Sequence, residues 1–213
     1  MIHPFEGETT WAGHASLVAE LQDQLPGVAA AAGYGHIPAA PGCIALSVGG
    51  GGLLMGVLRG CTAAGWTAEE TAVLAVETVG ADCLFQSVAA RKAVTLPAIT
   101  SIASSLGAPA ASPAALAACL EQGSRVTCAT VGDGVAVDAC MRLLQDHRML
   151  VEPACGAALA PVYRTRSSSG EAAPMSAALA EAKSVVVVVC GGANVTYEAL
   201  AKWHAGFAAS RGS

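Results

Sequence analysis

The segment Cys43–Gly56 reads CIALSVGGGGLLMG. A short apolar run, Cys43–Val48, ends at four consecutive glycines, and apolar residues then recur at helical spacing from Leu53 to Ala64. A short apolar run bounded by glycines is typical of a buried strand, and the spacing that follows is typical of a helix. The segment therefore predicts a strand, a tight turn and a helix, which is the repeating unit of α/β proteins.

The same order of strand and helix recurs along the chain. We expect strand 72–76 with helix 80–92, strand 125–130 with helix 132–145, and strand 185–190 with helix 195–209. The run Val185–Cys190 has no polar alternation, which is typical of a central parallel strand buried on both faces. The pattern predicts an open, mostly parallel α/β sheet with helices on both faces. In such sheets, ligands bind beyond the carboxyl ends of the strands.

The remaining segments complete the expected organisation. His14–Leu25 places its leucines and valine at helical spacing. Pro26–Gly42 is rich in Ala, Gly and Pro without periodicity, so we expect a surface loop or insertion. Arg166–Glu171 is a second loop candidate. We interpret residues 1–213 as a single portion of one domain.

Composition excludes several classes of function. The chain has 213 residues, a net charge of −5 and scattered basic residues, so nothing favours nucleic acid or a membrane surface as a partner. Val185–Cys190 is far shorter than a bilayer span. The eight cysteines form no CxxC pair and the histidines show no zinc spacing, which favours reduced, buried thiols. We see no secretory signal and expect a cytoplasmic protein.

The glycine segment also predicts chemistry. Glycines between a strand and a helix let backbone N–H groups converge on an anion at the helix amino end. The spacing does not fit GxGxxG, and Val57 after Gly56 excludes a P-loop. Four glycines exceed the needs of a turn, so we interpret them as a phosphate site. The alternative is a tight turn that requires positive φ.

Three other residues stand near strand ends. Cys190 follows the valine run and is either a group at the mouth of the sheet or a plain buried cysteine. Glu77 follows strand 72–76, and position alone favours a solvated carboxylate. Glu152, in Glu-Pro-Ala-Cys, is better explained as a residue at the start of a helix than as a catalyst.

Motifs in one order along the chain carry a family resemblance. From Ile2 to about Ala201, the sequence resembles L-serine dehydratases, which belong to the tryptophan-synthase-β-like, pyridoxal-phosphate (PLP) dependent enzymes of fold type II. The matching segments are Phe5, Trp11–Ser16, Ser47–Leu54, Glu77–Ala81, Leu96–Ser101, Leu106–Gly107, Leu150–Leu159 and Val189–Asn194.

The resemblance implies a cofactor site. Phosphate contacts are implied at Gly49, Gly50, Gly51, Gly52 and the amide of Leu53. Cys190 would hydrogen-bond the pyridine nitrogen, and a thiol there leaves the ring largely unprotonated. Ser105 would pack against one face of the ring, where relatives often carry Ala.

A monovalent cation, K⁺, is also implied by the resemblance. Its side-chain ligand would be Glu77. Its main-chain ligands would be the carbonyls of Gly49, Ala81, Leu106 and Ala108. An all-oxygen set suits a hard cation.

The implied reaction is β-elimination of L-serine, and of L-threonine, to a keto acid and ammonia. The family's Schiff-base lysine lies upstream of anything in this chain, and Lys92, Lys183 and Lys202 do not match its position. We therefore expect an incomplete large domain with the small domain largely missing, inactive alone. The alternatives are a non-catalytic PLP- or phosphate-binding paralogue, a partner subunit of a full-length enzyme, or a domain whose ligand has changed. Complete members are usually homodimers.

Overall fold

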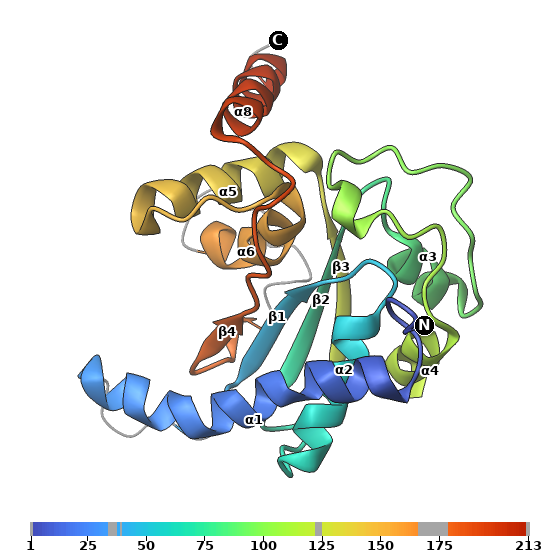
Figure 1. Cartoon of the computed structure of the whole chain (residues 1–213), viewed down its shortest axis with the longest axis vertical. Coiled ribbons are helices and arrows are strands. Elements are labelled where there is room, and N and C mark those ends of the chain that lie inside the picture. The colour runs from blue at the N-terminus through green and yellow to red at the C-terminus, as the bar shows by residue number, and fades with distance from the viewer. Residues whose placement is uncertain (1, 34–37, 39, 122–124, 166–178, 212–213) are drawn as a thin grey trace.

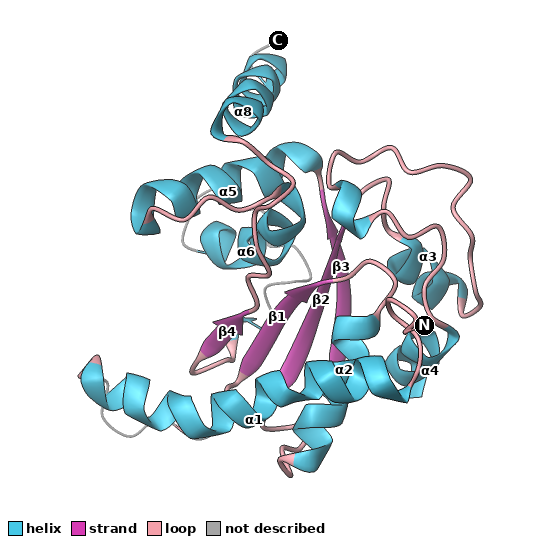
Figure 2. Cartoon of the chain, in the orientation of Figure 1, coloured by secondary structure: helices cyan, strands magenta, loops and turns pink. Residues whose placement is uncertain are grey.

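The computed structural model describes residues 2–33, 38, 40–121, 125–165 and 179–211. At its centre is a sheet in which every described strand pairing is parallel, in the order β3-β2-β1-β4 (Figures 1 and 2). The strands are β1 Cys43–Ser47, β2 Ala72–Thr78, β3 Val126–Val131 and β4 Val185–Val187. The predicted parallel α/β sheet is confirmed.

Helices cover both faces of this sheet, with α1 and α2 on one side and α5 and α6 on the other (Figure 1). Their bounds are α1 Glu8–Ala31, α2 Gly52–Ala63, α3 Cys83–Ala90, α4 Pro113–Glu121, α5 Asp133–His147, α6 Pro153–Thr165 and α8 Tyr197–Arg211, with a 3₁₀ turn η1 at Ser104–Leu106. Within the described residues, no helix is long and apolar enough to cross a membrane.

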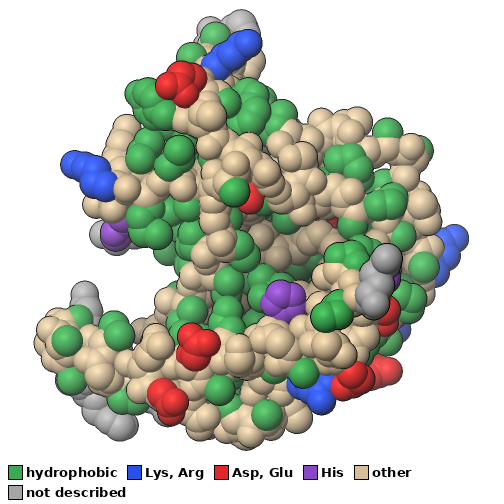
Figure 3. Space-filling model, viewed as in Figure 1, with side chains coloured by type: hydrophobic (Ala, Val, Ile, Leu, Met, Phe, Trp, Pro, Cys, Tyr) green, Lys and Arg blue, Asp and Glu red, His purple; other side chains and the backbone are tan. Residues whose placement is uncertain are grey.

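The strands divide the interior into two apolar layers. In β1, Cys43 and Ala45 face the layer under α5 and α6, whereas Ile44 and Leu46 face the layer under α1, α2 and α4. Successive side chains of a strand point to opposite faces, and both faces of β1 are buried. This explains why the strand shows no polar alternation. On the face shown in Figure 3, hydrophobic side chains line a hollow between the α1 and the α5–α6 layers.

Small residues let α1 and α2 pack closely. A Cβ added at Gly60 would lie 2.6 Å from Cγ2 of Val18, and one added at Gly56 would lie 2.2 Å from Cβ of His14. No real side chain fits these positions without moving α1. Helix packing thus explains Gly56 and Gly60, the two glycines of α2 that follow the four consecutive glycines.

Two predictions about the fold were wrong. The loop expected from Pro26 to Gly42 begins later, because α1 continues through Pro26 to Ala31. Pro26 removes one helical hydrogen bond and Gly27 also disfavours a helix, but Ala29 beyond them is buried, so packing rather than local propensity continues the helix. Residues 34–37 and 39, and the loop candidate 166–171, lie outside the described residues.

The valine run is the second correction. β4 was expected at the centre of the sheet, but it is an edge strand of the described sheet, and its residues are only partly buried. Both of its faces are apolar: Val185 and Val187 pack on one layer and Val186 on the other. The sequence of β4 therefore predicts that both of its faces are apolar, but it does not predict whether one or two strands lie beside it.

The packing of α1 on α2 predicts opposite effects for two glycine substitutions. Gly60→Ala should lower the free energy of unfolding by about 1–2 kcal/mol, because overpacking against Val18 exceeds the gain in helix propensity. Gly13→Ala, in α1 with no atom within 4 Å of the new Cβ, should raise it by about 0.5–1 kcal/mol. Urea unfolding of both variants measures the difference. Equal effects would contradict the packing described here.

Candidate functional site

A cavity of about 270 Å³ lies at the carboxyl end of β1. The glycine loop and the start of α2 (47–54) form its floor, and Pro4, Phe5, His14 and Ser105 complete its walls. Parallel sheets bind ligands at this end of their strands. A cavity therefore lies where the sequence predicted the site.

The amino end of α2 opens into this cavity. Gly51 is the residue before the helix and adopts a left-handed conformation, with φ of 99°. No side chain caps this helix end. The first amides of a helix lack partners within the helix and carry partial positive charge, so they bind anions well. The loop therefore has the chemistry of a phosphate site.

Packing accounts for the glycines independently of any ligand. A Cβ at Gly50 would lie 2.2 Å from the Phe5 ring, one at Gly52 would lie 2.8 Å from Cα of Phe5, and one at Gly51 would lie 2.6 Å from Cβ of Ala115. The tight-turn explanation is thus correct for Gly51, which also needs its positive φ. The case for phosphate depends on the uncapped helix end and the cavity, not on the number of glycines.

Phe5 is held in place over the loop. The indole Nε1 of Trp11 donates to the carbonyl oxygen of Phe5 at 3.1 Å. The backbone amide of Glu6 donates to Nδ1 of His3 at 2.9 Å. The motif Phe5 with Trp11 therefore has a structural role, since it fixes one wall of the cavity.

Glu77 differs from the solvated carboxylate that its sequence position favoured. It is 1% exposed, and its two carboxylate oxygens accept the amides of Leu84 at 3.0 Å and Phe85 at 2.6 Å. Burial raises the pKa of Glu77 to about 7, although those two amides lower it, and the neighbouring Asp82 raises it further. Among the described residues, Glu77 has no ion-pair partner. A buried carboxylate of this kind fits a site for a cation.

Of the residues expected to supply carbonyl ligands, Gly49 lies near Glu77 through Cys83, and Leu106 lies beside Gly49. The Cys83 thiol donates to the carbonyl oxygen of Gly49 at 3.7 Å and also contacts the carboxyl group of Glu77. A Cβ at Gly49 would lie 3.3 Å from Cα of Leu106. Ala81 is fully buried in the same apolar layer as Leu106. A buried carboxylate beside main-chain carbonyl oxygens is the kind of donor set that a hard cation prefers.

A hydrogen-bonded group that the sequence did not predict joins three segments beside the cavity. The Ser105 hydroxyl donates to Oε2 of Glu152 at 2.7 Å and accepts the side-chain amide of Asn194 at 3.1 Å. Glu152 also starts α6, as expected, since its carbonyl accepts the amide of Cys155. No sequence signal connects residues so far apart, and only the fold reveals the group.

Cys190 is exposed, so the plain buried cysteine is the wrong alternative. Its segment is held by Cys155, whose sulfur accepts the amide of Gly191 at 3.3 Å and whose thiol bonds the Gly191 carbonyl at 3.2 Å. Partial desolvation, with Cys155 and Glu152 nearby, raises the pKa of the Cys190 thiol. Cys190 is not among the residues that line the cavity, although Ser105 and Asn194 link the two regions.

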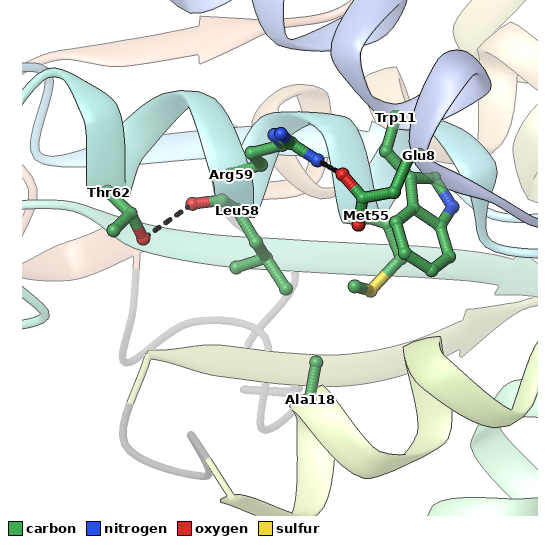
Figure 4. A pocket seen from close by; sticks show the side chains of 7 residues that line it. All are labelled: Glu8, Trp11, Met55, Leu58, Arg59, Thr62 and Ala118. Carbon is green, nitrogen blue, oxygen red and sulfur yellow. Dashed lines mark hydrogen bonds and ion pairs between the residues drawn. The ribbon is translucent and has the colours of Figure 1, made fainter.

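A second hollow of about 260 Å³ lies between α1, α2 and α4 (Figure 4). Apolar side chains line most of it, and an exposed ion pair between Arg59 and Glu8 crosses its rim. The Thr62 hydroxyl donates to the carbonyl of Leu58 in its own helix. No polar groups converge there on a ligand, so the cavity at the glycine loop is the candidate site.

Comparison with known proteins defines the class. The family described as "Pyridoxal-phosphate dependent enzyme" matches residues 1–191. Human serine dehydratase-like is 43% identical over 198 residues, covering 91% of this chain and 54% of that protein. A Saccharomyces cerevisiae protein named as a truncated L-serine dehydratase, SDL1, is 34% identical over 210 residues, covering 94% of this chain and 90% of that protein.

A solved structure extends the similarity to the fold. The fungal L-serine ammonia-lyase from Rhizomucor miehei superimposes with a TM-score of 0.75 and 31% identity, covering 96% of this chain and 58% of that chain. The chain belongs to the family of PLP-dependent enzymes, with the fold type II architecture of its neighbours. It spans about half the length of the mammalian serine dehydratases it matches.

The buried carboxyl of Glu77 predicts a pH dependence of stability. Its pKa is about 7 in the folded chain and near 4.5 when unfolded. Its contribution to the free energy of unfolding is therefore fully present below pH 4.5 and is lost as pH rises through 7. The loss is about 3 kcal/mol. Glu77→Gln should flatten this part of the curve. Urea unfolding at several pH values, in a buffer containing only tetramethylammonium as cation, measures it. Identical pH profiles for the two proteins would show that Glu77 does not titrate as described.

Proposed function

We propose that this chain binds PLP through its phosphate at the glycine loop and carries the cofactor-binding part of an L-serine ammonia-lyase. The observation that carries this proposal is the uncapped amino end of α2, which opens into a cavity at the carboxyl end of β1. Relatives named serine dehydratase-like and L-serine dehydratase/L-threonine deaminase support L-serine, and L-threonine, as the substrates. The reaction is β-elimination, which releases ammonia and, from serine, pyruvate.

The chain's residues would divide the work of holding the cofactor. Amides of the segment 49–53 would bind the phosphate dianion, helped by the partial positive charge of α2. The neutral thiol of Cys190 would hydrogen-bond the ring nitrogen and leave it largely unprotonated. PLP, when bound, supplies an electron-withdrawing ring that stabilises charge at the substrate Cα.

Ser105 would pack against one face of the ring. Its hydroxyl is already engaged by Glu152 and Asn194. A hydroxyl held in this way cannot turn freely toward the ring, so Ser105 presents mainly its Cβ there. This explains how a serine can stand where relatives often carry alanine.

Glu77 would hold K⁺ together with main-chain carbonyls of Gly49, Ala81, Leu106 and Ala108. The ion would neutralise a buried carboxylate that otherwise has no described ion-pair partner. It would also tie the glycine loop to η1, because Gly49 and Leu106 already lie in contact. Held there, K⁺ would help to fix the floor of the phosphate site.

We further propose that the chain alone does not turn over serine and that the Schiff-base lysine is supplied by a segment outside these 213 residues. No lysine lines the described cavity. The same observation supports the second candidate, a non-catalytic PLP- or phosphate-binding protein or partner subunit. Pyruvate formation from L-serine, with borohydride trapping of one specific lysine, would contradict both forms of the proposal.

The backbone amide of Leu53 offers a clean test of phosphate binding. Substituting the glycines disturbs packing against Phe5 and Ala115, whereas proline is tolerated in the first turn of a helix. Leu53→Pro should weaken PLP binding about tenfold or more, because it removes one donor to a charged oxygen. Leu53→Ala removes the side chain, keeps the amide and should bind normally.

Fluorescence titration with PLP, on variants whose folding is checked by circular dichroism, measures both affinities. Equal affinities for Leu53→Pro and Leu53→Ala, with both variants folded, would show that the phosphate does not use this amide. The glycine loop would then not be the phosphate site.

A further inference from the structure

Two cysteines lie side by side away from the cofactor site. The sulfur atoms of Cys119 and Cys128 are 3.9 Å apart, and the Cys128 thiol donates to the Cys119 sulfur. Cys119 lies on α4 and is buried, whereas Cys128 lies on β3 and is partly exposed. The partial exposure of Cys128 gives a small oxidant access to the pair.

We propose that Cys119 and Cys128 form a redox modification site that peroxide converts into a disulfide. A disulfide has an S–S length of about 2.05 Å, so the two sulfurs must approach by roughly 2 Å. Changes in the two side-chain torsions, with a small movement of α4, supply such an approach. Both residues are free cysteines in the structure, which represents the reduced state.

The hydrogen bond between the thiols assigns their roles. Donation from Cys128 lowers the pKa of Cys119, against the opposing effect of burial. The same contact raises the pKa of Cys128. The contact therefore favours Cys119 as the attacking sulfur, because the thiolate is the nucleophile, while the partly exposed Cys128 lies beside it to resolve the sulfenic acid.

The chemistry balances in two steps. The Cys119 sulfur attacks one peroxide oxygen, the O–O bond breaks, and a sulfenic acid and water form. The Cys128 sulfur then attacks the sulfenyl sulfur, the S–O bond breaks, and the hydroxyl leaves as water with the Cys128 proton. In total, two thiols and one peroxide become one disulfide and two waters.

The other close thiols are engaged differently. Cys140 donates to the carbonyl of Glu152, and Cys155 bonds the backbone of Gly191. Burial raises the pKa of Cys140 to about 12. These contacts are with backbone groups rather than with another sulfur, so they do not prepare a disulfide.

Helix α4 connects this pair to the glycine loop. The amide of Ser112, just before α4, donates to the carbonyl of Gly50 at 2.9 Å. Ala115 touches the loop, since a Cβ at Gly51 would lie 2.6 Å from its Cβ. Cys119 is one helical turn after Ala115 and shares its face. A displacement of Cys119 therefore reaches the loop through one rigid helix.

The disulfide should weaken the phosphate site, an effect that rests on the function proposed above. Closing the gap between the sulfurs would shift α4, and α4 carries Ala115 and directly follows Ser112, which hold Gly51 and Gly50. Ser112 and Ala115 would then be displaced relative to the loop. Oxidation is thus expected to reduce phosphate affinity about threefold or more, reversibly.

The test uses the full chain, purified reduced and then treated with stoichiometric hydrogen peroxide. After alkylation of free thiols and tryptic digestion, mass spectrometry should find one disulfide-linked peptide pair containing Cys119 and Cys128, because cleavage at Arg125 separates the two. Cys119→Ser and Cys128→Ser should abolish it, and Cys61→Ser, a buried cysteine elsewhere, should retain it. Failure to form this link, or a link between other cysteines, overturns the proposal.

Titration with inorganic phosphate separates the two claims. Oxidised protein should bind more weakly than reduced protein, and dithiothreitol should restore the affinity. Formation of the link with unchanged affinity refutes the coupling through α4. If reduced protein binds neither phosphate nor PLP while the link forms, the function proposed above fails and the redox site stands.

Discussion

The structure depends on the close approach of three segments to the backbone that follows β1. Phe5, Ala115 and Leu106 lie so near this loop that a side chain on Gly50, Gly51 or Gly49 would meet them within 2.2–3.3 Å. The loop can turn sharply only because it carries no side chains, and the turn leaves the amino end of α2 uncapped beside a cavity. The partial positive charge of that helix end favours an anion over a cation or a neutral group.

The other parts of the site stabilise this arrangement from a distance. Glu77 fixes the start of α3 through two amide hydrogen bonds and lies near the carbonyl of Gly49 through Cys83. Ser105, Glu152 and Asn194 join η1, α6 and the segment before α8. The contacts of Ser105 join residues 105, 152 and 194, so the site is built from segments far apart in the sequence.

The strands and most helices could be predicted because buried parallel strands and glycine turns leave local patterns. Cys43–Ser47 and Ala72–Thr78 are examples. The position of β4 could not, because apolar faces do not reveal how many strands flank it. Nor could the burial of Glu77 be read from its strand-end position, which suits solvent as well as a site. The likeness to family motifs predicted Glu77 as a cation ligand but not its burial. The contact of Ser105 with Asn194 left no trace in either pattern.

In the function proposed above, the phosphate ester, and not the ring alone, brings the cofactor to this chain. The most direct measurement compares pyridoxine 5′-phosphate with pyridoxine by isothermal titration calorimetry, since neither has an aldehyde that reacts with surface lysines. The account predicts saturable binding of the phosphate ester and at least about a hundredfold weaker binding of pyridoxine, the loss expected for several charge-assisted hydrogen bonds. Equal affinities, or no binding of the ester, would contradict it.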